Sequence, residues 1–488
     1  MPYFDDDSGE RCNAANETEC AALDRASHSN NPSLTDALQS PPTALAVRIK
    51  QIDGLPPDSH ESMALMFAAE HEPDVRYVAA WGVWMVWTGI KWAKDTTLKA
   101  FDLVRNWCRK TVYIVDPKSA KSVASAETVA AVERLAKSDR LLAATHDQWD
   151  RDQYALTTPG GVVSLHTGKV YGHEPNAYMT TATAVLPGGE CPRWIAFLER
   201  ITGGDIDLQR YLARVCGYCL TGDTKEQVMF FGYGTGANGK SVFLNTASSI
   251  MGDYAKTAPV ETFTASHGDR HPTELAGLQG ARFVTAIETE EGRHWDEAKL
   301  KALTGADVIS ARFMRQDFFE YKPIFKLMIV GNHMPGLRSV DEAIRRRLHL
   351  IPFTVTIPPE ERDPNLADLL KGEWPGILQW MIDGCLEWQK VGLNPPKCVT
   401  EATNDYLEAE DTTGTWMTER CWRGPDYRDR SLDLYKSYAE FCSKTGERPR
   451  SHKAFATIMK ARGFEKVKEG SGQVYLGICV IPTMLADD

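Results

Sequence analysis

The amino-acid sequence predicts an α/β fold built around a parallel sheet. Three apolar runs of strand length support this prediction, at 227–231, 282–287 and 325–330. The first run leads into a glycine-rich loop, the second into acidic residues and the third into Gly-Asn-His. Because parallel α/β sheets place ligands at the carboxyl ends of their strands, three strand ends are expected to supply parts of one site.

The loop after the first run has the complete phosphate-binding pattern G-x-x-x-x-G-K-[ST] at 234–241. Its glycines let backbone N–H groups close around phosphates, Lys240 reaches the β- and γ-phosphates, and the Ser241 hydroxyl can bind Mg²⁺. An apolar strand before the loop and an apolar helix start after it favour a nucleoside triphosphate site over a chance glycine turn. The residues expected to contact the nucleotide are Gly234, Thr235, Gly236, Ala237, Asn238, Gly239, Lys240, Ser241 and Val242.

Carboxylates and an amide follow the other two runs. Glu288 is the first candidate for holding Mg²⁺ or activating water, and Glu290 is the second. An acidic surface turn is the alternative interpretation of this segment. Asn332 follows the third run and can orient the attacking water beside the γ-phosphate.

Two basic segments accompany these strand ends. Arg345, Arg346 and Arg347 form a run that can supply an arginine finger to a neighbouring subunit, because a guanidinium stays protonated and offers a planar fork of donors. A solvated or ion-paired turn is the alternative. Residues 309–322 predict a β-hairpin with Arg315 at its tip, and nearby aromatic side chains suit a loop that grips single-stranded DNA. A purely structural hairpin has the same pattern.

Taken in order, these segments resemble superfamily 3 DNA helicases, specifically the helicase half of the phage and plasmid primase-helicases, which is similar to the poxvirus and satellite-phage alpha-type proteins. The matching segments are 234–241 as motif A, 288–291 as motif B, 301–307 with Arg312 as the motif special to this superfamily, 331–332 as motif C and 346–347 as the finger region. Thr289 separates Glu288 from Glu290, which leaves the metal ligand and the general base unassigned between these acids.

The resemblance implies an AAA+-type P-loop core whose subunits form a ring, usually a hexamer, and hydrolyse ATP with Mg²⁺ at their interfaces. It also implies 3′ to 5′ movement on single-stranded DNA, and action on forked DNA during replication of a phage, plasmid or other mobile element. Arg312, Arg315 and Lys322 are the expected hairpin contacts with DNA. Residues 1–60 are too few for a primase active site, so a primase, an origin-binding protein or a loader is expected to be separate.

Upstream, the segment 76–92 resembles the opening of the family's helicase-associated N-terminal domain. Its residues predict a strand pair in which Trp84, Trp87 and Trp92 pack in a core rather than stack on bases. Residues 1–60 have few large apolar side chains and are predicted to be a disordered tail. The predicted domains after this tail are an α+β associated domain at 61–190, a helical collar at 191–224, the ATPase core at 225–395 and a C-terminal winged helix at 400–488.

The C-terminal segment is basic within an acidic chain. From Lys444 to Lys468 there are eight lysines and arginines against two acids. Ser451 can cap a helix that runs to Arg462, and 464–478 predict a wing, so the segment resembles a winged helix that meets duplex DNA. A solvated basic face is the alternative. The expected DNA contacts are Arg450, Lys453 and Lys460.

The composition limits location and partners. A formal net charge of −11 argues against DNA coating the outer surface, but a basic pore or patch is compatible with it, because charges within a Debye length of ~10 Å set the local field. No apolar run reaches the roughly 18 residues of a membrane span, and the N-terminus lacks a signal-peptide core, so a cytoplasmic protein is expected. Cys216 and Cys219 form the single C-x-x-C, and their place on a helix face favours buried thiols over zinc ligands.

Two other functions would share the ATP site. A P-loop ATPase could remodel protein or sense nucleic acid without unwinding it, and such a protein would not need DNA-stimulated hydrolysis. An origin-binding protein that uses ATP only to assemble would place its specificity in 444–478. A small-molecule kinase has no evident use for the arginine run or for 301–307.

Overall fold

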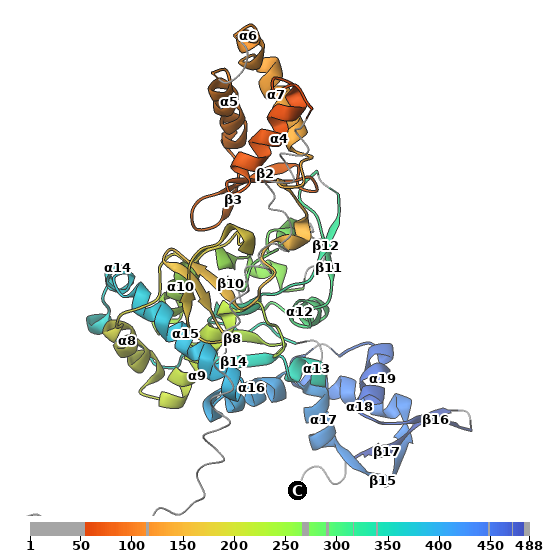
Figure 1. The fold of residues 1–488 in the computed structure, drawn as a ribbon. Coiled ribbons are helices and arrows are strands. Elements are labelled where there is room, and N and C mark those ends of the chain that lie inside the picture. The colour runs from red at the N-terminus through yellow and green to blue at the C-terminus, as the bar shows by residue number, and fades with distance from the viewer. Residues whose placement is uncertain are drawn as a thin grey trace, which may run out of the picture. The chain divides into compact units, whose positions relative to one another are not determined.

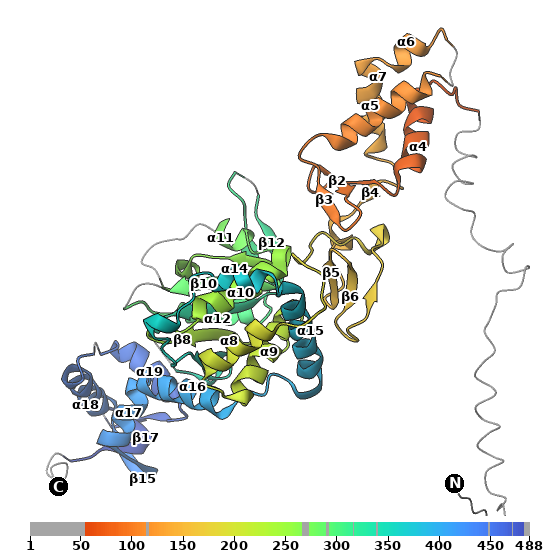
Figure 2. The same ribbon diagram turned by 90° about the vertical axis from the view of Figure 1, so that its left-hand side faces the viewer.

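The computed structural model describes residues 54–113, 117–265, 273–288, 292–315, 317–337, 340–447, 449–470 and 472–482. Most of the predicted tail, residues 1–53, therefore lies outside the described residues. The chain divides into two compact units, drawn in Figures 1 and 2. Within the described residues, one unit comprises 54–72 with Ala100–Ala143, and the other comprises Pro73–Lys99 with 144–482.

The first unit is helical. Its helices are α4 (His60–His71), α5 (Lys99–Thr111), α6 (Ala120–Val123) and α7 (Ala126–Ala136). Ser59 and Ser125 cap α4 and α7, because each hydroxyl oxygen accepts a hydrogen bond from the backbone N–H three residues later at 3.2 Å. In the core, Phe67 meets Trp107 edge to face at 6.3 Å, and the Trp107 indole N–H donates to Glu70 at 2.9 Å.

A five-stranded sheet lies at the centre of the second unit, with the order β14-β8-β13-β10-β9 and parallel pairing throughout. Its strands are β8 (Met229–Tyr233), β9 (Ala255–Thr257), β10 (Phe283–Glu288), β13 (Lys326–Gly331) and β14 (Leu348–Pro352). The three predicted runs form β8, β10 and β13. The predicted α/β class and parallel sheet are thus confirmed.

Helices cover both faces of this sheet (Figure 1). Successive strand residues point to opposite faces, so Phe230 and Phe231 belong to different hydrophobic cores. The core of Phe230 includes α8 (Pro192–Thr202), α9 (Ile206–Leu220), α10 (Lys240–Met251), α14 (Leu366–Lys371) and α15 (Trp374–Val391). The core of Phe231 includes α11 (Thr273–Ala276), α12 (Glu297–Thr304), α13 (Glu342–Arg345) and α16 (Lys397–Ala409).

Two buried basic side chains stabilise the sheet at the N-terminal ends of its strands. Arg282 precedes β10, and its guanidinium donates to the main-chain carbonyls of Leu220, Asp152 and Ala155 at 2.8 to 3.0 Å. Lys326 opens β13 and donates to the carbonyls of Thr221, Asp223 and Ile324. Burial lowers the pKa of Lys326 to about 7. These bonds fasten the sheet to the end of α9, to the residues that follow it and to the segment at 152–155.

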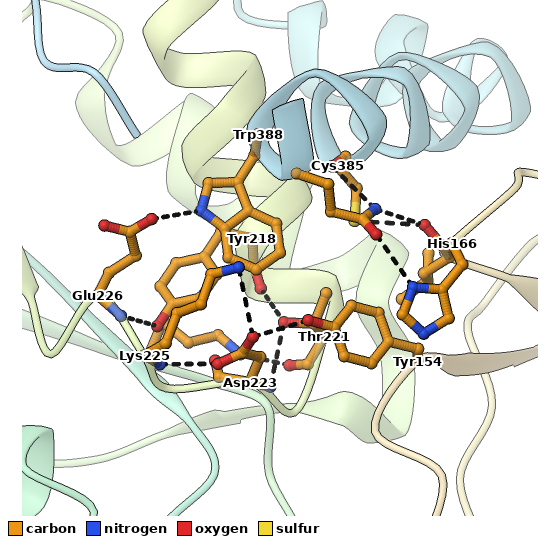
Figure 3. A network of polar contacts seen from close by, with 12 residues as sticks. Tyr154, His166, Tyr218, Thr221, Asp223, Lys225, Glu226, Cys385 and Trp388 are labelled. Carbon is orange, nitrogen blue, oxygen red and sulfur yellow. Dashed lines mark hydrogen bonds and ion pairs between the residues drawn. The ribbon is translucent and has the colours of Figure 1, made fainter. Parts of the chain in front are cut away.

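A polar network joins the segments beside β5 (Ala155–Thr158) and β6 (Gly161–Ser164) to the chain after α9 and to α15 (Figure 3). The Tyr154 hydroxyl donates to Asp223 at 2.7 Å, and its ring stacks on His166 at 4.0 Å between centroids. The Trp388 indole N–H donates to Glu226 at 2.8 Å. Buried indole and phenol groups need such partners, so these contacts also fix the chain between α9 and β8.

The other strands form smaller sheets. These are β3-β2-β1-β4 with β1 (Val75–Val78), β2 (Val83–Trp87), β3 (Trp92–Lys94) and β4 (Ala143–Ala144); β5-β6-β7 with β5 (Ala155–Thr158), β6 (Gly161–Ser164) and β7 (Val170–Tyr171); and the hairpin of β11 (Ile309–Ala311) and β12 (Phe319–Tyr321). Trp84 and Trp92 are buried, in agreement with the predicted core packing. Short 3-10 helices span His146–Gln148, Pro175–Ala177, Gly252–Tyr254, Val260–Thr262 and Pro359–Glu361.

The C-terminal region has its own core around Trp416, Tyr438 and Phe455. Its elements are α17 (Thr412–Arg420), β15 (Cys421–Arg430), α18 (Ser431–Lys444), α19 (His452–Ala461), β16 (Lys466–Glu469) and β17 (Gly472–Val480), with the sheet order β15-β17-β16. Ser451 caps α19 as predicted, accepting from the Ala454 N–H at 3.3 Å. Within the described residues, no helix is both long and apolar enough to cross a membrane.

Helices α9 and α15 cross at two glycines. A Cβ atom on Gly384 would overlap the backbone of Ala213, and one on Gly217 would overlap the backbone of Cys385. On the same helix, Cys216 and Cys219 are buried free thiols, as predicted, and burial raises the pKa of Cys219 to about 12.

Replacing Gly384 with Ala should destabilise the protein by about 3 kcal/mol, because backbone atoms cannot move aside as a flexible side chain can. Denaturant unfolding of the full chain measures this. Gly172→Ala is the matched control, because nothing lies within 4 Å of its Cβ position. Equal midpoints for the two variants would contradict the close crossing.

His349 on β14 should make stability depend on pH. Burial lowers its pKa to about 4, and its Nδ1 lies 2.6 Å from the Tyr211 hydroxyl. An unfolded histidine titrates near ~6.5, so the unfolded chain binds a proton that the folded chain excludes. Stability is therefore lost as the pH falls from about 6.5 towards 4. The fall in urea midpoint across this window should be smaller in His349→Gln than in the wild type, and an equal fall in the two proteins would contradict this prediction.

Candidate nucleotide-binding site

The phosphate loop connects β8 to α10 through a tight backbone path. Gly239 has φ +80° and sits against α8, where a Cβ atom would overlap Ile201 and Phe197. The Asn238 side-chain amide donates to the Phe353 carbonyl at 2.7 Å, and the Ile357 N–H donates to the Ala237 carbonyl at 2.8 Å. The loop is thus held by α8 on one side and by the segment after β14 on the other.

Lys240, the first residue of α10, joins two of the predicted strand ends. Its Nζ donates to the Gly234 carbonyl at 2.6 Å and to the Asn332 Oδ1 at 3.2 Å. The side chain is buried, and this burial lowers its pKa from the ordinary lysine value. Asn332 follows Gly331 at the end of β13, so the geometry brings the predicted motif A lysine and motif C asparagine into contact.

The acidic strand end lies beside that of β13. Glu288 is the last residue of β10 and is in register with Gly331. Glu290, the second candidate carboxylate, and Glu291 lie outside the described residues.

A cleft of about 420 Å³ opens along these strand ends. It is lined by the residues of the phosphate loop from Gly236 to Lys240, by Ser241 and Val242, and by Ile287, Val330, Gly331 and Asn332. Thr235 and Ser241 are exposed. The cleft therefore combines the N-terminus of α10, where backbone N–H groups favour anions, with a lysine and an amide.

The three arginines have different surroundings. Arg347 is 8% exposed, and its guanidinium donates to the Thr304 hydroxyl at 3.2 Å and to the Ala343 carbonyl at 2.9 Å. Arg346 is exposed, and Arg345 is half-buried. The motif at 301–307 contacts α13, the helix that contains Arg345. Lys301 forms an ion pair at 2.5 Å with Asp341, the N-cap residue of α13. This motif therefore supports the arginine-bearing segment.

The hairpin tip carries exposed apolar side chains, including aromatic ones as predicted. Phe313, Met314 and Phe318 are exposed, and the Arg312 guanidinium lies 4.8 Å from the Phe318 ring. Arg315 is exposed with φ +62°, in the loop between the strands, and Lys322 is exposed just beyond β12. Phenylalanines in a turn are the sequence pattern that indicates these exposed rings, because turns are otherwise polar.

The predicted DNA contacts at α19 are accessible to different degrees. Lys453 and Lys460 are exposed, and Arg450 is half-buried next to the start of the helix. Arg462, which directly follows the helix, forms an ion pair with Asp411. Asp411 also caps α17 by accepting from the Gly414 N–H at 2.9 Å, so Arg462 is held by a carboxylate that the fold already orders.

Comparison with known families gives two matches. Residues 64–203 match the family described as D5 N terminal like, and residues 232–347 match a family of unknown function. The chain is 27% identical over 328 residues to "Putative helicase 022R" of Frog virus 3 (isolate Goorha), which covers 62% of this chain and 32% of that protein. The D5 N-terminal-like match and the viral relatives confirm the predicted resemblance to the helicase half of the primase-helicases.

A second viral relative is "Putative helicase L207/L206" of Acanthamoeba polyphaga mimivirus, 25% identical over 266 residues that cover 50% of this chain and 28% of that protein. The chain spans about a third of the length of these curated relatives. Among solved structures, the apo structure of the NrS-1 C terminal region overlaps 86% of this chain and 99% of its own, at 9% identity and a TM-score of 0.48.

Arg347→Met should lower the free energy of unfolding by about 2 kcal/mol, because it removes buried hydrogen bonds to Thr304 and Ala343. Arg346→Met is the matched control and should change it by less than about 0.5 kcal/mol, since that side chain is exposed. Denaturant unfolding measures both. Equal losses would show that the two arginines do not differ as described.

Proposed function

We propose that the chain is an ATP-dependent DNA helicase, with a superfamily 3 AAA+ core that works as a hexameric ring. It moves 3′ to 5′ on single-stranded DNA and acts on forks during replication of a phage, plasmid or other mobile element. The contact between Lys240 and Asn332 carries this proposal, because it joins a phosphate-binding lysine to a water-orienting amide in one cleft. The helicase names of the viral relatives support the motor class.

The residues of the cleft fit ATP with Mg²⁺. The backbone N–H groups at the start of α10 would hold phosphate oxygens, and Lys240 would bind the β- and γ-phosphates. Ser241 and Glu288 would hold Mg²⁺, which neutralises phosphate charge when bound. Asn332 would orient water, and Glu288 or Glu290 would accept its proton.

Arg346 is the proposed finger of the arginine run. It is exposed beside a segment held by 301–307, whereas Arg347 already donates to partners of its own chain. A finger must reach the nucleotide of a neighbouring subunit, which favours an exposed guanidinium. Arg347 then contributes by fixing α13.

Two surfaces are proposed to contact DNA. The hairpin would meet the single strand through Arg312, Arg315 and Lys322, with exposed aromatic rings nearby for stacking on bases. The C-terminal region would act as a winged helix, with Arg450, Lys453 and Lys460 at α19 and a wing of β16 and β17. The proposed domains keep the boundaries 61–190, 191–224, 225–395 and 400–488.

Lys240→Ala should lower the turnover number for ATP by at least about 10²-fold, because the variant lacks the cation that stabilises the transferring phosphoryl group. ATP hydrolysis is measured with and without single-stranded DNA, together with strand displacement on a 3′-tailed fork. Stimulation by DNA and strand displacement, both lost in the variant, are the expected results.

Hydrolysis that is indifferent to DNA, without displacement, would favour a remodelling or sensing ATPase. Loss of site recognition on deletion of 444–478, with fork unwinding retained, would assign that region to origin binding within a helicase. Displacement that survives in Lys240→Ala would contradict the proposed motor.

A further inference from the structure

Helix α16 contacts the loop that follows Asn332. The Tyr406 hydroxyl donates to the Pro335 carbonyl at 2.5 Å, and the Glu410 carboxylate accepts from the Leu337 N–H at 2.6 Å. Tyr406 is 6% exposed, so its hydrogen bond is shielded from water. Tyr406 of α16 and Glu410, the C-cap residue of this helix, thus hold two main-chain groups of the segment that leaves β13.

The same helix face also holds the strand after the arginine run. Thr403 accepts from the Leu350 N–H of β14 at 3.0 Å. Residues 403, 406 and 410 are three and four positions apart, which places them on one face of the helix. α16 therefore spans the two segments that carry Asn332 and the arginines.

The loop after Asn332 is held from its other side as well. The Trp295 N–H donates to the Gly336 carbonyl at 3.0 Å, and the Gly336 N–H donates to the Arg293 carbonyl at 2.8 Å. These residues follow the acidic end of β10. The loop lies between this segment and α16, so removal of the bonds to α16 frees one side while the other remains in place.

We propose that Tyr406 and Glu410 are positioning residues of the ATPase site, which hold the loop after β13 so that Asn332 stays beside Lys240. The inference rests on the proposed function. Neither residue lines the cleft, and each acts through main-chain atoms three to five positions beyond Asn332. The expected defect lies in turnover rather than in ATP binding, because the phosphate loop has separate supports at Asn238 and Gly239.

The test is steady-state ATP hydrolysis by the full chain. Tyr406→Phe and Glu410→Ala should each lower kcat about tenfold while KM for ATP changes less than about twofold. Glu410→Gln should keep most of the wild-type kcat, because its amide oxygen can still accept from the Leu337 N–H. Glu408→Ala is the matched control, since Glu408 is exposed on the same helix two positions earlier.

Hydrolysis by the wild type that is lost in Lys240→Ala establishes the ATP site independently of this inference. Wild-type kcat in Glu410→Ala and Tyr406→Phe would then overturn the positioning role alone. Equal loss of kcat in Glu410→Gln and Glu410→Ala, with a lowered thermal midpoint in both, would also overturn it, since it would indicate general destabilisation. Absence of hydrolysis by the wild type would overturn the proposed function and this inference with it.

Discussion

The parallel pairing of β13 between β8 and β10 is the constraint on which the candidate site depends. Gly331 is level with Tyr233 on one side and with Glu288 on the other. This register brings the phosphate loop, the acidic segment and Asn332 together at the C-terminal ends of the three strands. Because side chains alternate between faces, a slip of one residue would reverse the core contacts of β13 as well as displace its end, so hydrophobic packing and site geometry enforce the same register.

The N-terminal and C-terminal ends of the parallel strands are stabilised differently. At the N-terminal ends of the strands, Arg282 and Lys326 are buried and donate hydrogen bonds to main-chain carbonyls. At the C-terminal ends of the strands, the polar groups face a cleft. The loops there are held by contacts outside the sheet, through Gly239 packed against α8 and through Glu410 at the C-cap of α16. The fold is thus held at the N-terminal ends of the strands and around the cleft at their C-terminal ends. The groups that line the cleft therefore stay available for a ligand.

Local patterns sufficed for the phosphate loop, the three strands, the hairpin and the cap of α19, because neighbouring residues determine each of them. The sequence could not separate Arg346 from Arg347, since burial of one depends on Thr304 in a distant helix. It likewise missed the pairing of Arg462 with Asp411, which are far apart in the chain. The position of Asn332 at the end of β13 could be predicted from the sequence, whereas the hydrogen bonds of Tyr406 and Glu410 with the loop beyond it arise only in the folded chain.

The buried thiols of α9 have a chemical consequence. Because burial raises the pKa of Cys219 to about 12, its side chain is almost entirely a neutral thiol at pH 7. Alkylating reagents and soft metal ions react with the thiolate, so this C-x-x-C is nearly inert while the fold persists. Modification of Cys219 therefore reports opening of the α9 and α15 crossing, and maleimide labelling under denaturing and native conditions distinguishes the open chain from the closed one.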